Sequence, residues 1–233
     1  MIEVSWALDH LDDLAFRVAQ HIELAAIPVV IGFAISLALA IWAVRRPVVR
    51  GPIVSASGVL YTIPSAALFA ALLPVTGIEI QTAVIPLTLY TLLIYLRNML
   101  AGLDGVAPEV IEAADAMGYG RWQRLLRVEL PLALPLIVGG VRLASVSTIG
   151  LVTVSGILGD RFGGLGFFIF EGYRHNFGIE IAFGAVPTIL LALAVDLVLQ
   201  RLQGRLTPWA PRTVRAIDPG RADPGRAVAG GAA

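Results

Sequence analysis

Long runs of apolar residues alternate with short polar stretches along this chain. Residues 24–44 hold 21 positions without a charge, enough at ~1.5 Å per helical residue to cross a hydrocarbon core of ~30 Å. Four further runs have a similar character, so we predict an all-α integral membrane protein with five transmembrane helices. The predicted spans cover approximately residues 20–44, 53–73, 78–96, 132–158 and 181–199.

Prolines and glycines interrupt several of these runs. Pro64 and Pro86 lie inside the second and third runs, where each removes a backbone hydrogen bond and favours a kink. Pro64 is a candidate pathway residue, and a packing bend without a transport role is the alternative. The fourth run contains Gly139 and Gly140, whose small size lets helices approach closely. We therefore expect the fourth span to be central in the bundle. Separately, Pro47, Gly51 and Pro52 predict a short turn over residues 45–52.

The third and fourth runs are separated by a polar segment, residues 106–131. Pro108 suits the first turn of a helix, and Gly118 suits the left-handed residue that ends one. Residues 121–130 then form a second amphipathic pattern that ends at Pro131. The pattern predicts two short helices folded about a glycine. An ordinary solvated loop is the alternative.

Composition supports the membrane class and excludes several activities. The 233 residues are 57% hydrophobic and 15% charged, with a mean hydropathy of +0.81. There is no lysine, so the chain cannot form the nucleotide-binding loop whose lysine reaches the phosphates. There is no cysteine, and the three histidines lack metal-ligand spacing. We predict no catalytic, cofactor-binding or metal-binding residue, so any ATP hydrolysis belongs to another chain.

Arginine placement predicts the orientation in the membrane. Thirteen of the seventeen arginines lie in residues 45–52, in residues 97–131 and from residue 201 onward. Cytoplasmic loops carry such an excess of positive charge. We therefore expect residues 1–17 to form an extracytoplasmic N-terminal segment and the C-terminus to be cytoplasmic. The composition of residues 208–233, rich in Pro, Ala, Gly and Arg, predicts a disordered cytoplasmic tail.

The polar segment carries a specific resemblance to a known family. Its residues Glu112-Ala113-Ala114, Gly118, Val128 and Leu130-Pro131 resemble the EAA loop of permease subunits of bacterial binding-protein-dependent ABC importers, with valine at the usual isoleucine position. The resemblance extends over residues 18–207. Three further segments resemble the osmoprotectant subfamily, which imports glycine betaine, carnitine or choline: TIPS at 62–65, LLPVTGI at 72–78 and GGLG at 163–166.

The resemblance implies a fold, partners and roles for particular residues. It implies a type I importer permease fold. It also implies that the EAA-like loop, with Glu112, docks as a cytoplasmic coupling helix on an ATPase. The alternative for Glu112 is that it only caps its helix. The implied partners are two ABC ATPase subunits carrying ATP–Mg, a second permease in a homodimer or heterodimer, an extracytoplasmic binding protein and the lipid of the bacterial inner membrane, with no nucleic acid. The residues carried over to the ATPase interface are Glu112, Ala113, Ala114, Gly118, Leu130 and Pro131.

Two charged residues interrupt the predicted spans. Arg142 lies about three turns into the fourth span, where a lone charge is costly unless it is paired or hydrated. Arg142 could extend its side chain to the cytoplasmic face, or it could have a role in the pathway or in an ion pair, and both interpretations stay open. An ion pair between Arg142 and Asp196 is geometrically feasible. For Asp196 itself we favour an interfacial position. Glu23 and His21, near the outer end of the first span, are expected at the lipid headgroup level.

The segment between the fourth and fifth spans is rich in glycine and aromatic residues. Gly163, Gly164 and Gly166 do not form a phosphate loop, because no strand precedes them and no lysine follows. The resemblance implies a tight turn near the outer gate, which faces the binding protein. The surrounding aromatic residues favour a membrane-interface belt over a cation–π surface for a quaternary ammonium solute: Phe162, Phe167, Phe168, Phe170, Tyr173 and Phe177.

Two other functions remain as alternatives at this stage. Permeases for methionine or polar amino acids share the EAA-like loop and the five-span plan. A membrane scaffold or sensor without transport would instead use the loop to bind some other cytoplasmic protein.

Overall fold

The protein is a bundle of long helices. The computed structural model describes residues 2–210, with side chains from Trp6 onward. Every regular element within that range is helical. Most of the predicted tail, residues 211–233, lies outside the described residues. The elements are α1 (Ile2–Asp9), α2 (Leu11–Arg45), α3 (Pro47–Thr62), α4 (Ser65–Thr76), α5 (Ile80–Asp104), α6 (Pro108–Ala116), α7 (Arg121–Arg124), η1 (Leu125–Glu129), α8 (Leu130–Val152), η2 (Thr153–Leu158), α9 (Gly166–Arg174) and α10 (Gly178–Leu206).

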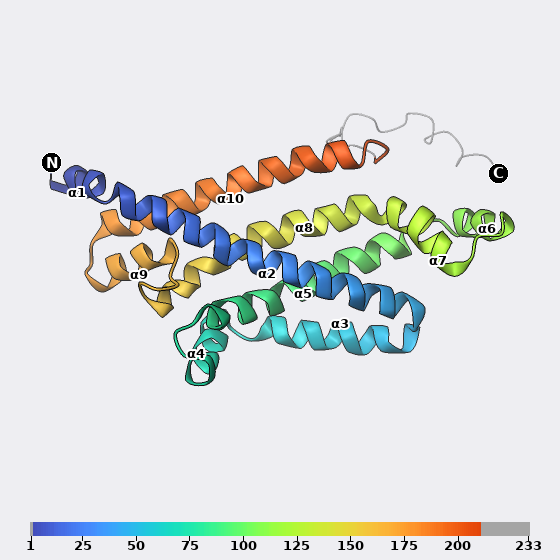
Figure 1. Ribbon diagram of the computed structural model, residues 1–233, viewed down its shortest axis with the longest axis horizontal. Helices are drawn as coiled ribbons and strands as arrows, with labels where there is room; N and C mark the ends of the chain where they lie inside the picture. The colour runs from blue at the N-terminus through green and yellow to red at the C-terminus, as the bar shows by residue number, and fades with distance from the viewer. Residues whose placement is uncertain (1, 211–233) are drawn as a thin grey trace, which may run out of the picture.

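The four longest helical segments run alongside one another and give the bundle its elongated shape (Figure 1). In the described part of the chain, α2, α5, α10 and the continuous segment from Arg121 to Leu158 are each long and apolar enough to cross a membrane. The α3–α4 pair adds a fifth span if it counts as one. α6 and α7 lie at one end of the bundle, and α1, α4 and α9 lie toward the other. The five predicted spans are therefore present when α3 and α4 together are counted as one broken second span.

The second span is broken rather than kinked. α3 and α4 meet at Ile63 and Pro64 with a bend of 91°. Pro64 cannot donate a backbone hydrogen bond, and its ring disfavours a helical conformation at the residue before it. Ile63 is accordingly extended, with ψ of 127°. The predicted short turn over residues 45–52 is wrong, because α3 already begins at Pro47, in the first-turn position that proline favours.

Three helices extend beyond their predicted spans. α2 begins at Leu11 rather than near residue 20, and α5 continues past Arg97 to Asp104. α10 begins at Gly178 and ends at Leu206. Charged residues mark where a helix leaves the lipid, but they do not end its backbone hydrogen-bond ladder.

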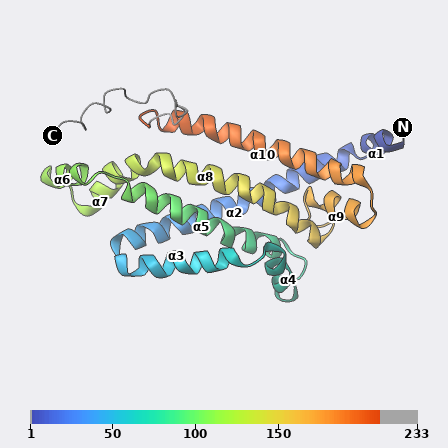
Figure 2. The same ribbon diagram turned by 180° about the vertical axis from the view of Figure 1, so that it is seen from behind.

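α5 lies at the centre of the bundle and contacts α2, α3, α4 and α8. Its buried residues Tyr95, Leu96 and Met99 pack against small residues of the neighbouring helices. The small residues include Ala40 and Ala43 of α2 and Ala133 and Ala144 of α8. Small side chains allow the helix backbones to approach closely, and this close packing stabilises helix association in lipid. Figure 2 shows α3 and α4 along the edge of the bundle that lies beside α5.

Candidate functional site

The EAA-like loop, residues 106–131, projects from one end of the bundle (Figure 1). α6 begins at Pro108 and ends at Ala116, as the proline and glycine signals predict. Gly118 has a φ of +81°, the left-handed conformation that favours glycine. Its N–H donates to the Asp115 carbonyl at 2.9 Å. The chain therefore reverses tightly after α6.

The second half of the loop differs from the prediction. No free-standing second helix forms, because α7 continues through η1 into α8 as one segment from Arg121 to Leu158. The Leu130 N–H donates to the Leu125 carbonyl five residues earlier, so the turn before Pro131 is wider than an α-helical turn. A proline ring normally clashes with the carbonyl four residues before it. We attribute the continuity of the helix past Pro131 to this widened turn.

The loop residues implied by the resemblance fall into two groups. Glu112, Ala113 and Gly118 are exposed at the projecting end, whereas Ala114 is buried. Glu112 is the fifth residue of α6, too far along the helix to cap its start. The other two residues, Leu130 and Pro131, begin α8 and belong to the long helix rather than to the projecting tip.

Arg124 connects the two halves of the loop. Its Nη1 donates to Asp115 Oδ1 at 2.7 Å and to Oδ2 at 2.6 Å, and its Nε donates to Glu129 Oε1 at 2.7 Å. Charge-assisted hydrogen bonds of this kind are roughly twice as strong as neutral ones. The guanidinium of Arg45, at the end of α2, also lies over the ring of Trp122. α6 and α7 are thereby held to the end of the bundle.

Apolar side chains are exposed on this otherwise polar loop. Met117 is 66% exposed, and Val110 is also exposed on the same short helical unit. Trp122 is about half exposed on α7. The loop extends beyond the predicted spans, so lipid does not explain these exposed side chains. Exposed apolar residues with a polar surround are typical of a protein interaction surface.

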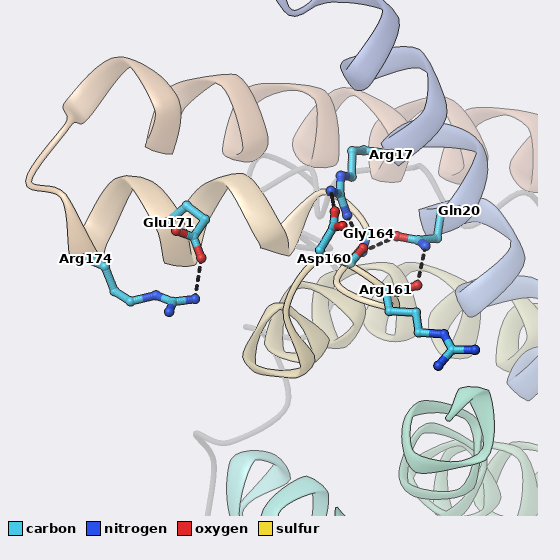
Figure 3. A network of polar contacts seen from close by, with 7 residues as sticks. All are labelled: Arg17, Gln20, Asp160, Arg161, Gly164, Glu171 and Arg174. Atoms are coloured by element: carbon cyan, nitrogen blue, oxygen red, sulfur yellow. Dashed lines mark hydrogen bonds and ion pairs between the residues drawn. The ribbon is translucent and has the colours of Figure 1, made fainter. Parts of the chain in front are cut away.

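A second polar network joins α2 to the loop before α9 (Figure 3). Arg17, whose side chain is only 3% exposed, donates to both the carboxylate and the carbonyl of Asp160. Gln20 donates to the Arg161 carbonyl at 2.8 Å and accepts from the Gly164 N–H at 2.8 Å. Sequence analysis placed residues 1–17 in an extracytoplasmic segment and did not predict this role for Arg17.

His21 completes the attachment of this loop, a packing role that the sequence did not predict; its predicted headgroup level stays a prediction. His21 is fully buried. Its Nδ1 accepts from the Leu165 N–H at 3.2 Å, so its Nε2 carries the proton that is donated to the Ile149 carbonyl at 3.0 Å. The imidazole thus joins α2 to the loop and to α8. Glu23, by contrast, is exposed.

The three glycines of the predicted outer turn are buried against neighbouring backbone. Gly164 has a φ of +53° and lies against His21, while the Gly166 backbone contacts that of Thr153. Only glycine leaves room for these approaches. The chain does make a tight turn here, in which the three residues form packing contacts, and their role near an outer gate stays a prediction. Gly163 packs against Gly159 and Phe167.

The predicted aromatic belt is only partly correct. Phe168 is 1% exposed and belongs to the core. The Arg17 guanidinium carbon lies 3.9 Å from the centroid of the Phe167 ring, within the range of a cation–π contact. Tyr173 is the most exposed of the six residues. This aromatic cluster therefore stabilises the fold around Arg17 as well as providing exposed rings.

The remaining charged and candidate pathway residues lie at two other places in the bundle. Arg142 and Asp196, left open by the sequence, form a two-point ion pair between α8 and α10. Pro64 is exposed at the bend between α3 and α4. Tyr61 and Tyr90, which sequence reasoning did not single out, lie beside this bend. The proline within TIPS, Pro64, was the available sequence signal, but its partner on α5, Tyr90, is visible only in the fold.

Comparisons with known proteins agree on the family of proteins that this chain resembles. The model of the family described as "Binding-protein-dependent transport system inner membrane component" matches residues 25–210. A carnitine transport permease protein of Listeria monocytogenes is 36% identical over 203 residues, which is 87% of this chain and 92% of the relative. An osmoprotectant import permease protein of Salmonella typhimurium is 37% identical over 213 residues, 89% of this chain and 98% of the relative.

Further relatives and solved structures extend the comparison. A choline transport system permease protein of Bacillus subtilis is 32% identical over 205 residues, 88% of this chain and 94% of the relative. A chain of the MetNI methionine ABC transporter in an inward-facing conformation superposes with a TM-score of 0.71 at 23% identity, covering 83% of this chain and 96% of that chain. This structural similarity shows the same fold.

Proposed function

The chain belongs to the family of binding-protein-dependent transport system inner membrane components, and we propose that it forms the membrane pathway for a quaternary ammonium osmoprotectant such as glycine betaine, carnitine or choline. The observation that carries the proposal is the identity of 31–37% to permeases named for these solutes, over most of both chains. As a permease subunit of such a transporter, it is a multi-pass membrane protein and not itself an ATPase.

The two alternative functions have less support. The similarity to a methionine transporter is at 23% identity and reports the shared fold alone. A scaffold without transport leaves the relatives' transport names unexplained. We therefore retain the quaternary ammonium solute as the proposed substrate class.

We infer that the EAA-like loop is the docking surface for a separate ATPase that binds ATP–Mg. Three features support this: the exposed Glu112 and Ala113, the reversal at Gly118, and the exposed apolar side chains of Val110 and Met117. Arg124 and Arg45 anchor the loop to the bundle, so a force applied to the tip is transmitted to the helices. The continuous segment beginning at Arg121 then carries the displacement into the membrane.

The proposed assembly places the loop in the cytoplasm. The arginine distribution supports an outer N-terminus and a cytoplasmic C-terminus. The complete importer would contain two such permeases, as a homodimer or with a sister chain, two ATPase subunits and an extracytoplasmic binding protein. The network around Arg17, Gln20 and Gly164 would then stabilise the loop that faces the binding protein.

Reconstituted transport tests the substrate class. The permease is incorporated into proteoliposomes with its ATPase and binding protein, and uptake of labelled choline, carnitine and glycine betaine is measured with internal ATP. We expect ATP-dependent uptake of at least one of these, competed by the other quaternary ammonium solutes and not by methionine. Uptake of methionine alone would contradict the proposal.

A loop variant tests the docking role separately. Gly118→Asp should allow ATP hydrolysis but strongly reduce uptake, while membrane insertion stays normal. Gly120, which has a φ of −67° and open space around it, provides the matched control Gly120→Asp. Normal uptake by Gly118→Asp would count against docking. Because the chain has no cysteine, labelling of Glu112→Cys with an impermeant thiol reagent tests which side the loop occupies.

A further inference from the structure

The break between α3 and α4 lies at the edge of the bundle, about level with the middle of α5. The Tyr90 hydroxyl donates to the Ile63 carbonyl at the break. Tyr90 is the eleventh of the 25 residues of α5, so the break lies roughly 15 Å along a helix that crosses a core of ~30 Å. Non-helical backbone at this depth is tolerated only where protein covers it or water reaches it.

The exposed surface around the break differs from a lipid-facing surface. α10 exposes large apolar residues, including Ile189, Leu193 and Val198, as expected for contact with acyl chains. α3 and α4 instead expose mostly small or polar residues next to the break, with Val59 (65% exposed) as the large apolar exception on α3 and Leu73 and Val75 exposed only farther along α4. The small or polar residues are Ser55, Ala56, Thr62, Ala66, Ala67, Ala70 and Ala71. This contrast favours an aqueous pathway over lipid on the α3–α4 side.

The carboxyl end of α3 presents a negative electrostatic end to this surface. The last carbonyls of a helix lack intrahelical donors, and together they form the negative pole of the helix dipole. Thr62 Oγ1 donates to the Val59 carbonyl at 2.7 Å, and the Ile63 N–H donates to that of Leu60 at 3.3 Å. Pro64 has no N–H to offer the Tyr61 carbonyl three residues earlier. Such broken helix ends favour cations.

One aromatic ring stands at this negative end. Tyr61 is 43% exposed and meets Tyr90 in an edge-on arrangement, with ring centroids 5.7 Å apart and an interplanar angle of 77°. Tyr90 is itself buried, and its hydroxyl is engaged by the Ile63 carbonyl. Tyr90 therefore fixes both the Tyr61 ring and the adjacent carbonyl end.

We propose that the α3–α4 break is a binding station for the quaternary ammonium group of the solute, with the Tyr61 ring and the carboxyl end of α3 as its contacts and Tyr90 as a positioning residue. This inference rests on the proposed function, because it assigns part of the pathway for that solute class. The solute passes through unchanged, so the station needs only reversible binding.

The chemistry of the site suits this group. A quaternary ammonium has no N–H and cannot donate a conventional hydrogen bond, so it is recognised by aromatic faces and by the negative ends of dipoles. No carboxylate side chain is required. A full negative charge would hold the cation more tightly than passage along a pathway allows.

Cysteine labelling tests where the station lies, independently of transport. Thr62→Cys is introduced into the naturally cysteine-free chain and exposed in proteoliposomes to a membrane-impermeant methanethiosulfonate that bears a trimethylammonium group. We expect labelling, and slower labelling when choline is present at high concentration. Ile189→Cys on the lipid-like face of α10 is the matched control and should not react. Failure of Thr62→Cys to react would overturn the proposal.

Ring substitutions test the cation–π contact in the complete transporter. Tyr61→Phe retains the ring and should keep most of the choline uptake, whereas Tyr61→Leu should lower it by about fivefold to thirtyfold. ATP hydrolysis and the amount of assembled complex provide controls for folding. Equal uptake by Tyr61→Leu and the unsubstituted transporter would overturn this inference alone. Absence of quaternary ammonium uptake by the unsubstituted transporter would instead overturn the proposed function, and the inference with it.

Discussion

Arg142 of α8 and Asp196 of α10 form a two-point ion pair, with Arg142 Nη2 donating to Asp196 Oδ2 at 2.7 Å and Arg142 Nε donating to Oδ1. The side chains are 33% and 28% exposed. Only two residues of α10, Gly184 and Thr188, are buried within the described part of this chain. The pair is therefore a specific attachment of α10 to the bundle, and it places two membrane charges where each compensates the other.

Breaking this pair should destabilise the protein. Asp196→Asn leaves the Arg142 charge without its partner, and Arg142→Leu leaves the Asp196 carboxylate without its partner. A charge left without its partner is more costly than a site from which both charges are removed. The double variant Arg142→Leu/Asp196→Leu should therefore have a higher melting temperature in detergent than Asp196→Asn or Arg142→Leu alone. A double variant less stable than both singles would contradict a direct interaction.

The α5–α8 crossing predicts a position-specific effect of a single methyl group. A Cβ at Gly140 would lie 2.7 Å from the Asn98 Cβ, whereas a Cβ at Gly150 of the same helix would meet nothing within 4 Å. Gly140→Ala should cost about 1–3 kcal/mol because the backbones cannot separate freely. Gly150→Ala should be neutral or stabilising by up to about 1 kcal/mol. Thermal unfolding of the two variants in the same detergent measures the difference.

The left-handed residue of the EAA-like loop predicts a local effect on stability. Gly118 has a φ of +81°, while the neighbouring Gly120 has a φ of −67°. Gly118→Ala should therefore cost about 1–2 kcal/mol, and Gly120→Ala should have little effect. Hydrogen exchange at α6 amides would show faster exchange for the first variant only. Equal exchange in the two variants would exclude a conformational role for Gly118.

Arg124 should control the attachment of α6. Arg124→Gln removes the hydrogen bonds to Asp115 and leaves Glu129, whose side chain is 9% exposed, without its charged partner. Charge-assisted hydrogen bonds are worth about 1.5–3 kcal/mol, so exchange of α6 amides should accelerate by about tenfold or more. Arg127→Gln, which removes an exposed arginine of the same helix, is the control. Unchanged exchange after Arg124→Gln would show that α6 is held by other contacts.

The sequence predicted the number and order of the spans because apolar runs of sufficient length are dictated by the thickness of the membrane. It did not predict the effects of the prolines. Pro64 breaks a helix, Pro86 lies within α5 without ending it, and Pro131 follows a widened turn. The outcome at each proline depends on whether neighbouring elements satisfy the displaced carbonyl groups, and that information is tertiary.

The polar contacts of the candidate sites were also beyond reach of the sequence alone. The EAA-like motif located α6 and Gly118, because caps and left-handed glycines are local features. The contacts of Arg17 with Asp160 and of Tyr90 with Ile63 join residues 143 and 27 positions apart. Single-residue patterns carry no record of such pairs, and the contacts of His21 with Ile149 and Leu165 were missed for the same reason.

The uninterrupted helix from Arg121 to Leu158 has a mechanical consequence. Its 38 residues form a rod of about 55 Å, and a tilt of about 5° around its middle would move its two ends by about 2.5 Å in opposite directions. If the segment moves as one body, its two ends cannot both swing inward together. In the proposed assembly of two permeases, such a pivot would widen the gap on one side of the membrane as it narrows the gap on the other, and so would avoid a leak state open to both sides.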